Sequence, residues 1–145
     1  TLTCVSNPVG GELVGNAAWT GYRVRDLLEQ AGIHPDADMV LSKSIDGFTA
    51  GSPVEALTDD RGSLLAVGMN GQPLPTEHGY PARLVVPGLY GYVSATKWVV
   101  DLELTPADLG FSNEFDHSTW RGRLATERAY KHLGIAGTGK QGSLF

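Results

Sequence analysis

The sequence has little sulfur: it contains one cysteine, Cys4, in 145 residues. A single cysteine cannot form a disulfide within the chain, so cysteine pairing gives no indication of the redox compartment. No second cysteine is available for a structural zinc site, and the four histidines show no short metal-ligand spacing. A disulfide within the chain is therefore excluded, a structural zinc site is disfavoured, and Cys4 needs another explanation.

Positive charge and long apolar runs are also scarce. The chain has 11 Lys and Arg against 16 Asp and Glu, a formal net charge of -5, which opposes binding to nucleic acid or to an anionic membrane. No apolar run approaches the roughly 20 residues that cross a bilayer, and the first residues lack a basic-then-apolar secretory signal. We therefore expect neither a nucleic-acid partner nor a membrane span in this chain.

The composition, 41% hydrophobic and 19% charged, is that of one globular unit with a core. Residues 1–5 predict the end of a strand, and the Gly- and Pro-rich stretch that follows predicts a loop, so Cys4 is expected where a strand meets a loop. Because the chain starts inside this apolar-polar alternation, we expect it to begin partway through a larger protein.

Hydrophobic periodicity predicts a helix from Thr20, with Thr20 as N-cap and Gly32 as the residue after the helix. The pair Asn70-Gly71 is typical of a type I′ hairpin. In residues 97–104, Trp98, Val100, Leu102 and Leu104 alternate with Lys97, Val99, Asp101 and Glu103, which predicts a strand with the first set buried. Further strands are predicted at residues 39–44, 63–69 and 82–86. The expected class is α+β, a mixed β-sheet with few helices.

Residues 105–145 are interpreted as an unassigned C-terminal extension. Residues 118–133 favour a helix ended by Gly134, and a mobile tail is expected from Gly137. The domain is thus predicted to occupy residues 1–104.

Three stretches, TLTCVSN, MNGQPLPTEHGYPARLVVPGLYG and TKWV, together with the segment WTGYRVRDLLEQAG, carry a family resemblance across residues 1–104. They are similar to the molybdopterin-binding domain of sulfite oxidases and their bacterial relatives. The resemblance implies part of a sulfite-oxidase-like molybdopterin-binding fold, with the molybdenum cofactor (molybdopterin) as its cofactor. Many bacterial relatives act outside the cytoplasm, so the resemblance favours an extracytoplasmic location.

By this resemblance, Cys4 is the catalytic residue that ligates molybdenum, beside the two dithiolene sulfurs of the pterin cofactor. A soft thiolate suits such a metal-sulfur site, and a metal stabilises the deprotonated thiol. The alternative is that Cys4 is a small buried hydrophobe. Asn7 matches the family's C-x-x-N pattern, in which its amide orients the metal loop, and a plain loop-forming asparagine is the alternative.

The resemblance assigns further residues to the pterin and its phosphate. His78 and Arg83 match the His and Arg that hold them; the alternative is a turn histidine and a surface ion pair. Lys97 matches a lysine that contacts the cofactor, with Ser94 and Thr96 completing an anion-binding loop. Asp46 resembles an acidic residue that accepts hydrogen bonds from the pterin, with an Asp-Gly turn as the alternative. Tyr90 or Tyr92 is expected near the mouth of the pocket.

Two departures from the family shape the expected function. Sulfite oxidases place arginines after the cysteine loop, whereas this chain has Pro8, Val9, Gly10 and Gly11, and the family's upstream Arg-Asn-His segment is not in the chain. We therefore predict a molybdenum-dependent oxidoreductase domain for oxygen-atom transfer or related two-electron chemistry, not a true sulfite oxidase. A small-molecule substrate and an electron-transfer partner, both unidentified, are implied. The alternative is a non-catalytic scaffold or interaction module with an incomplete cofactor site.

Overall fold

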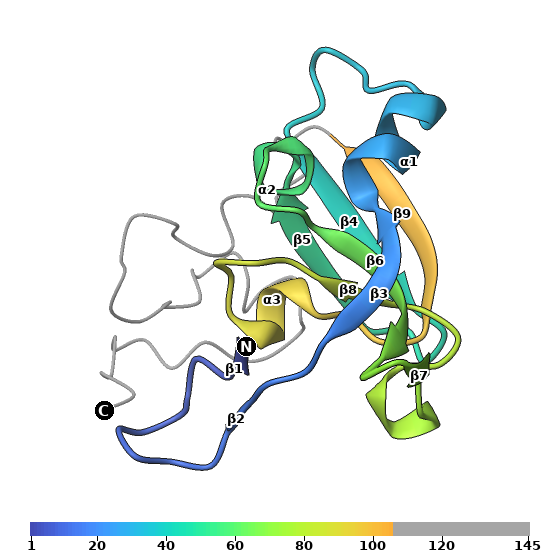
Figure 1. Ribbon diagram of the computed structural model, residues 1–145. Helices are drawn as coiled ribbons and strands as arrows, with labels where there is room; N and C mark the ends of the chain where they lie inside the picture. The colour runs from blue at the N-terminus through green and yellow to red at the C-terminus, as the bar shows by residue number, and fades with distance from the viewer. Residues whose placement is uncertain (106–145) are drawn as a thin grey trace, which may run out of the picture. The chain divides into compact units, whose positions relative to one another are not determined.

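The computed structural model describes residues 1–105 (Figure 1). Three short α-helices and one 3-10 helix punctuate the strands of this part of the chain. The helices are α1 (Val24–Ala31), α2 (Val54–Thr58), α3 (Gly91–Ser94) and the 3-10 helix η1 (Thr76–His78). The strands are β1 (Leu2–Thr3), β2 (Val14–Gly15), β3 (Trp19–Arg23), β4 (Met39–Ser44), β5 (Thr49–Pro53), β6 (Leu64–Met69), β7 (Gln72–Pro73), β8 (Arg83–Val85) and β9 (Val99–Thr105).

The strands form two main sheets and a short ribbon, and every pairing within residues 1–105 is antiparallel. One sheet has the order β3-β6-β7, with β8 also paired to β6; the second has the order β5-β4-β9. The strands β1 and β2 form the ribbon. Helices α1 and α2 pack beside each other at one end of the strands (Figure 1). The predicted α+β class with few helices is confirmed.

Both main sheets contribute to one hydrophobic core, with α1 and α2 packed against it. Its buried members are Val24, Leu28, Val40, Ala56, Leu57, Leu84 and Val86. Burying a large apolar side chain contributes about 1.5–3 kcal/mol, so this cluster is the main source of stability in the described residues. The core holds β4 and β8 in place, and residues at the ends of these strands contribute to the candidate site.

The predicted start of the first helix at Thr20 is wrong. Thr20 lies in β3 and pairs with Gly68 of β6, and α1 begins only at Val24, after Arg23 in an extended conformation. Long-range pairing with β6 occupies the backbone that a helix would need, and the aromatic and β-branched residues of β3 suit a strand. The predicted end is confirmed, because Gly32 has a φ of 86° and its N–H donates to the carbonyl of Leu28.

The last strand departs from the predicted alternation at Val100, which is 57% exposed. The register of β9 against β4 shifts there: Lys43 pairs with Asp101, but Ser44 pairs with Val99, so Val100 is the extra residue of a β-bulge. Val99 packs against the core instead. The predicted Asn70-Gly71 turn is confirmed, because both residues have positive φ, 52° and 76°, as a type I′ turn requires.

No helix in residues 1–105 is long and apolar enough to cross a membrane. The helix predicted at residues 118–133 and the tail predicted from Gly137 lie outside the described residues.

Candidate functional site

Cys4 lies where β1 gives way to a loop, as predicted, and its side chain is partly exposed. The Cys4 N–H donates to the carbonyl of Leu13 (3.0 Å), and the Cys4 carbonyl accepts from the N–H of Asn7 (3.1 Å). These two bonds close the segment of residues 4–13, which we call the cysteine loop. The alternative of a fully buried cysteine is wrong, because the thiol is accessible to a ligand from outside the chain.

The local electrostatics favour the thiolate of Cys4. Its Sγ lies 3.0 Å from the Ser6 hydroxyl, and this hydrogen bond, followed by the backbone N–H groups of Ser6 and Val5, lowers the pKa of the thiol. Within residues 1–105 no group of three or more His, Cys, Asp or Glu side chains could hold a metal ion. A metal on Cys4 would therefore need its other ligands from a cofactor or from outside these residues.

Asn7 stabilises the cysteine loop through its side chain. Its Oδ1 accepts a hydrogen bond from the N–H of Leu13 (2.8 Å), which is the loop-forming role. A Cβ on Gly11 would lie 2.5 Å from this oxygen, so the loop needs glycine there to close. Orientation of a metal site by Asn7 stays a prediction, and the bond to Leu13 is compatible with it.

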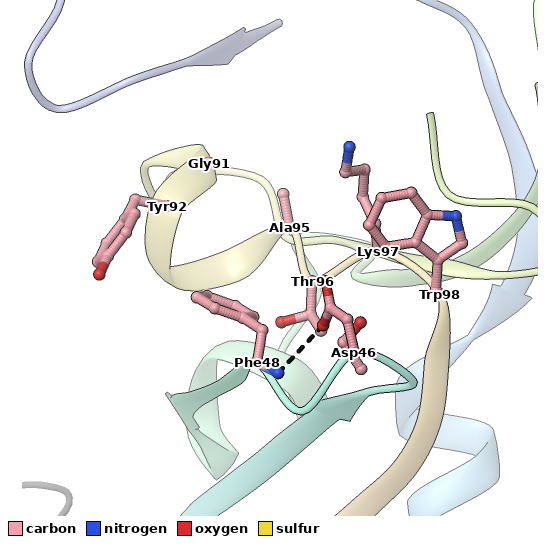
Figure 2. Close-up of a pocket in the computed structure, with 9 residues that line it drawn as sticks. Asp46, Phe48, Gly91, Tyr92, Ala95, Thr96, Lys97 and Trp98 are labelled. Carbon is pink, nitrogen blue, oxygen red and sulfur yellow. Dashed lines mark hydrogen bonds between the residues drawn. The ribbon is translucent and has the colours of Figure 1, made fainter. Parts of the chain in front are cut away.

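A pocket of 280 Å³ lies between the β4–β5 hairpin and the segment that leads from α3 into β9 (Figure 2). In Figure 2, Phe48 and Tyr92 stand on one side and Lys97 and Trp98 on the other. The rings of Phe48 and Tyr92 meet edge to face, with centroids 6.2 Å apart. The pocket is lined by Ser44, Asp46, Phe48, Gly91, Tyr92, Ala95, Thr96, Lys97 and Trp98.

Asp46 contributes a carboxylate to this pocket from the turn between β4 and β5. Its Oδ1 accepts from the N–H of Phe48 (3.1 Å), and Gly47 has a φ of 89°, so the predicted Asp-Gly turn is present. The pKa of Asp46 is lowered, first by the nearby Ser44 hydroxyl, then by the Phe48 N–H, with a smaller contribution from the charge of Lys97. Because Oδ1 serves the turn, Oδ2 is the oxygen that remains for a ligand.

Ser44 is a pocket residue that the sequence motifs did not indicate. The period of the strand places Val40, Ser42 and Ser44 on the buried face of β4, so that face changes from apolar to polar toward the pocket. Ser44 Oγ is the one buried side-chain polar atom of residues 1–105 without a hydrogen-bond partner. The Ser44 hydroxyl is close enough to Asp46 to lower the pKa of that carboxyl, but it is not aligned to form a hydrogen bond with it. An unpaired buried hydroxyl costs roughly 1–3 kcal/mol, which a bound ligand could recover.

The other two predicted hydroxyls are engaged within the protein. Ser94 Oγ donates to the carbonyl of Tyr90 (2.9 Å), inside the turn of α3. Ser42 Oγ donates to the carbonyl of Ala50 and lies 2.8 Å from Thr96 Oγ1, so the Thr96 hydroxyl is the donor of that second bond. Thr96 can therefore offer the pocket only acceptor positions. Lys97 is left as the charged donor of the predicted anion-binding loop.

Arg83 is buried, with 6% of its surface exposed. Its guanidinium donates to the carbonyls of His78 (3.0 Å) and Ala95 (3.4 Å), and it lies 4.9 Å from the ring centre of Trp19. Burial lowers the pKa of Arg83, and no salt bridge joins it to an acidic residue of the described part. The alternative of a surface ion pair is therefore wrong for Arg83.

Three side chains converge on the backbone of η1. Trp98 Nε1 donates to the carbonyl of Thr76 (3.0 Å), Lys97 Nζ to that of Glu77 (2.8 Å), and Arg83 Nη1 to that of His78 (3.0 Å). We call Arg83, Lys97, Trp98 and these carbonyls the η1 cluster. The His78 side chain is exposed, so His78 and Arg83 meet through a backbone carbonyl.

The predicted residues thus separate into groups. Asp46, Thr96 and Lys97 line the pocket, as does Tyr92, whereas Arg83, His78, Ser94 and Tyr90 do not. Cys4 and Asn7 lie in the cysteine loop. The two regions approach each other at Gly91, because a Cβ on this pocket residue would lie 3.7 Å from the Thr3 carbonyl oxygen. Phe48 and Trp98 were not predicted as pocket residues, although Trp98 stands inside the TKWV motif.

Comparison with known proteins identifies relatives of this arrangement. A family model described as "Oxidoreductase molybdopterin binding domain" matches residues 1–112. The uncharacterized oxidoreductase YuiH of Bacillus subtilis is 39% identical over 87 residues, covering 60% of this chain and 43% of YuiH. The mitochondrial sulfite oxidase of Drosophila melanogaster is 32% identical over 121 residues, covering 78% of this chain and 21% of that enzyme.

A solved structure agrees with the family match. The sulfane dehydrogenase SoxCD from Paracoccus pantotrophus matches with a TM-score of 0.64 and 26% sequence identity, over 87% of this chain and 36% of that chain. The chain therefore spans less than half the length of each of these relatives.

Proposed function

Because this chain belongs to the oxidoreductase molybdopterin-binding domain family, we propose that it is the part of a molybdenum-dependent oxidoreductase that carries the metal-ligating cysteine and one wall of the cofactor site. The observation that carries the proposal is the accessible thiol of Cys4, whose pKa is lowered, in a loop whose strand approaches the pocket at Gly91; in that pocket the buried Ser44 hydroxyl is unpaired. When bound, the molybdenum cofactor supplies two-electron redox chemistry, including oxygen-atom transfer.

The residues of the pocket fit the organic part of this cofactor. A pterin carries N–H donors, a carbonyl and ring-nitrogen acceptors. Asp46 Oδ2 can accept from the N–H edge, while the unpaired Ser44 hydroxyl can donate or accept beside it. Lys97 supplies positive charge on the same pocket. Arg83 and His78 are proposed to act at the phosphate end, in keeping with their family positions.

The cysteine loop would supply the protein's ligand to the metal. Ser6 stabilises the thiolate form of Cys4, and metal binding requires that form. The backbone hydrogen bonds of Cys4 with Leu13 and with Asn7 orient the thiol without enclosing it. The other metal ligands would come from the cofactor's dithiolene, consistent with the absence of a three-residue metal site in residues 1–105.

The substrate is proposed to be a small molecule other than sulfite. An oxyanion site needs cations, and the cysteine loop contains no Lys or Arg; it presents the fully exposed Val9 and two glycines instead. A less charged oxide, or a reductive two-electron reaction, suits such a loop better. A separate electron-transfer partner is part of this proposal.

Metal and pterin analysis tests the proposal. The full chain, and a longer form with any natural upstream segment, are produced in a host that makes molybdenum cofactor. We expect molybdenum and pterin in about equal amounts, and a thiolate-to-molybdenum absorption band that disappears in Cys4→Ser. Absence of stoichiometric molybdenum from the longer form would overturn the proposal.

A second candidate is a non-catalytic module that keeps the fold. It is favoured by the η1 cluster, in which Lys97 and Arg83 are already bonded to backbone carbonyls. This alternative predicts a stable cofactor-free domain that binds one specific protein partner. Molybdenum in the longer form excludes it, so the same analysis separates the two candidates.

A further inference from the structure

Trp98 has a backbone conformation that bulky residues rarely adopt. Its φ is 51°, in the left-handed region, and Asn70 in a tight turn is the other non-glycine residue with positive φ within residues 1–105. For a large aromatic side chain this conformation is strained, and it persists only where the surroundings hold the residue in place. Such outliers gather at functional sites.

Trp98 connects two segments that are distant in sequence. Its Nε1 donates to the carbonyl of Thr76 in η1 (3.0 Å), and its own carbonyl accepts from the N–H of Ile45 (3.0 Å) in the turn that carries Asp46. The residue therefore ties the η1 turn to the β4–β5 turn. The strained φ lets the indole reach η1 while the carbonyl faces the β4–β5 turn.

The indole ring also lies against the ammonium group of Lys97. Lys97 Nζ is 4.4 Å from the ring centre of Trp98 and donates to the carbonyl of Glu77 (2.8 Å), next to the Thr76 carbonyl that Trp98 binds. A lysine has many rotamers, and a ring together with a carbonyl restricts them. Both side chains line the pocket (Figure 2).

We propose that Trp98 is a positioning residue that holds the Lys97 ammonium at the wall of the pocket and locks the η1 turn to the turn of Asp46. The position of Lys97 follows from its contacts with the Trp98 ring and the Glu77 carbonyl. The expected effect of Trp98 on cofactor binding rests on the proposed function. A pocket whose cation is positioned beforehand binds an anionic or polar ligand without first ordering a flexible side chain.

The positioning of Lys97 can be measured in the chain without cofactor. The lysines are acylated with a limiting amine-reactive reagent, and the rate at Lys97 is followed by peptide mass spectrometry relative to exposed Lys43. We expect slow modification of Lys97 in the native chain, about twofold faster in Trp98→Phe, which keeps the ring, and roughly fivefold to tenfold faster in Trp98→Leu. Equal rates at Lys97 and Lys43 in the native chain, or no effect of either variant, would overturn the proposal.

Cofactor retention tests the consequence for binding. Release of pterin from loaded protein after dilution is expected to be about threefold faster in Trp98→Phe and roughly tenfold faster in Trp98→Leu. Val24→Ala, a substitution of a buried core residue that does not line the pocket, controls for stability. If the rate of pterin release depends on the thermal midpoint in the same way in Trp98→Phe, Trp98→Leu and Val24→Ala, then Trp98 acts only through stability. That result would overturn the positioning role. Absence of the molybdenum cofactor from the longer form overturns the proposed function, while the acylation experiment still decides the role of Trp98.

Discussion

The cysteine loop and the η1 cluster are stabilised in opposite ways. The cysteine loop depends on bonds among its own residues, and Val9 in it is fully exposed. The η1 cluster is joined by side chains up to 22 residues away in sequence, around Arg83 with 6% of its surface exposed. We therefore expect substitutions in the region that would bind the metal to leave the free energy of unfolding nearly unchanged. Substitutions in the region that would bind the organic cofactor should lower it.

Replacing the cysteine should give the largest difference between the regions. In Cys4→Ser we expect loss of the thiolate-to-molybdenum absorption band from loaded protein, with the free energy of unfolding changed by less than about 0.5 kcal/mol. The thiol is partly exposed and makes a side-chain hydrogen bond to Ser6. Absorption spectroscopy and urea unfolding measure the two effects. A band that is unchanged in Cys4→Ser would show that Cys4 is not a ligand of the metal.

Removing the guanidinium of Arg83 should damage the fold itself. Arg83→Met leaves the carbonyls of His78 and Ala95 without their donors and loses the contact with Trp19. We expect a loss of roughly 2–4 kcal/mol in the free energy of unfolding. Arg25→Met is the matched control, because its ion pair with Asp60 is exposed and contributes less than about 1 kcal/mol. Equal losses of unfolding free energy in Arg83→Met and Arg25→Met would show that the buried guanidinium of Arg83 does not stabilise the fold.

Gly79 tests how tightly the η1 cluster is packed. Its φ is 112°, and a Cβ there would lie 3.0 Å from the Cβ atoms of both Arg83 and Lys97. Gly79→Ala should therefore cost about 1–2 kcal/mol in unfolding free energy and separate the two cationic side chains. Gly15→Ala, with open space around the new methyl group and no positive φ, is the control. If thermal unfolding does not distinguish the two variants, the cluster is looser than described.

The smallest expected effect concerns acidity. The Asp46 carboxyl has a folded pKa below its ordinary value, so its contribution to stability is present at neutral pH and is lost as pH falls through that lowered pKa. Ser44→Ala removes the first cause of the lowering and should raise the pKa of Asp46 toward its ordinary value. Carbon-detected NMR titration measures it, with Ser63→Ala as a control outside the pocket. An unchanged pKa in Ser44→Ala would assign the lowering to the Phe48 N–H instead.

Local sequence patterns predicted the elements whose signals are themselves local. The Asn70-Gly71 turn, the end of α1 at Gly32 and the strand-to-loop position of Cys4 each depend on a few adjacent residues. The predictions at Thr20 and Val100 failed because pairing with a distant strand decided both. β6 paired with the segment expected to start a helix, and β4 imposed a bulge on β9.

The candidate site shows the same division. The family motifs identified Asp46, Thr96 and Lys97, which the structure brings to one pocket. They did not indicate Ser44 or Trp98, because a missing hydrogen-bond partner and a strained φ are properties of three-dimensional surroundings.

By itself, the sequence determined the family, through the resemblance of its motifs, and the fold class, because hydrophobic periodicity is recorded in residue types and short spacings. Only the tertiary structure decided which polar groups are satisfied. It buried Arg83 on backbone carbonyls, left Ser44 unpaired, and set the indole of Trp98 against Lys97. Hydrogen bonds and cation-ring contacts depend on distances of a few ångströms between segments far apart in the chain, and no local pattern records those distances.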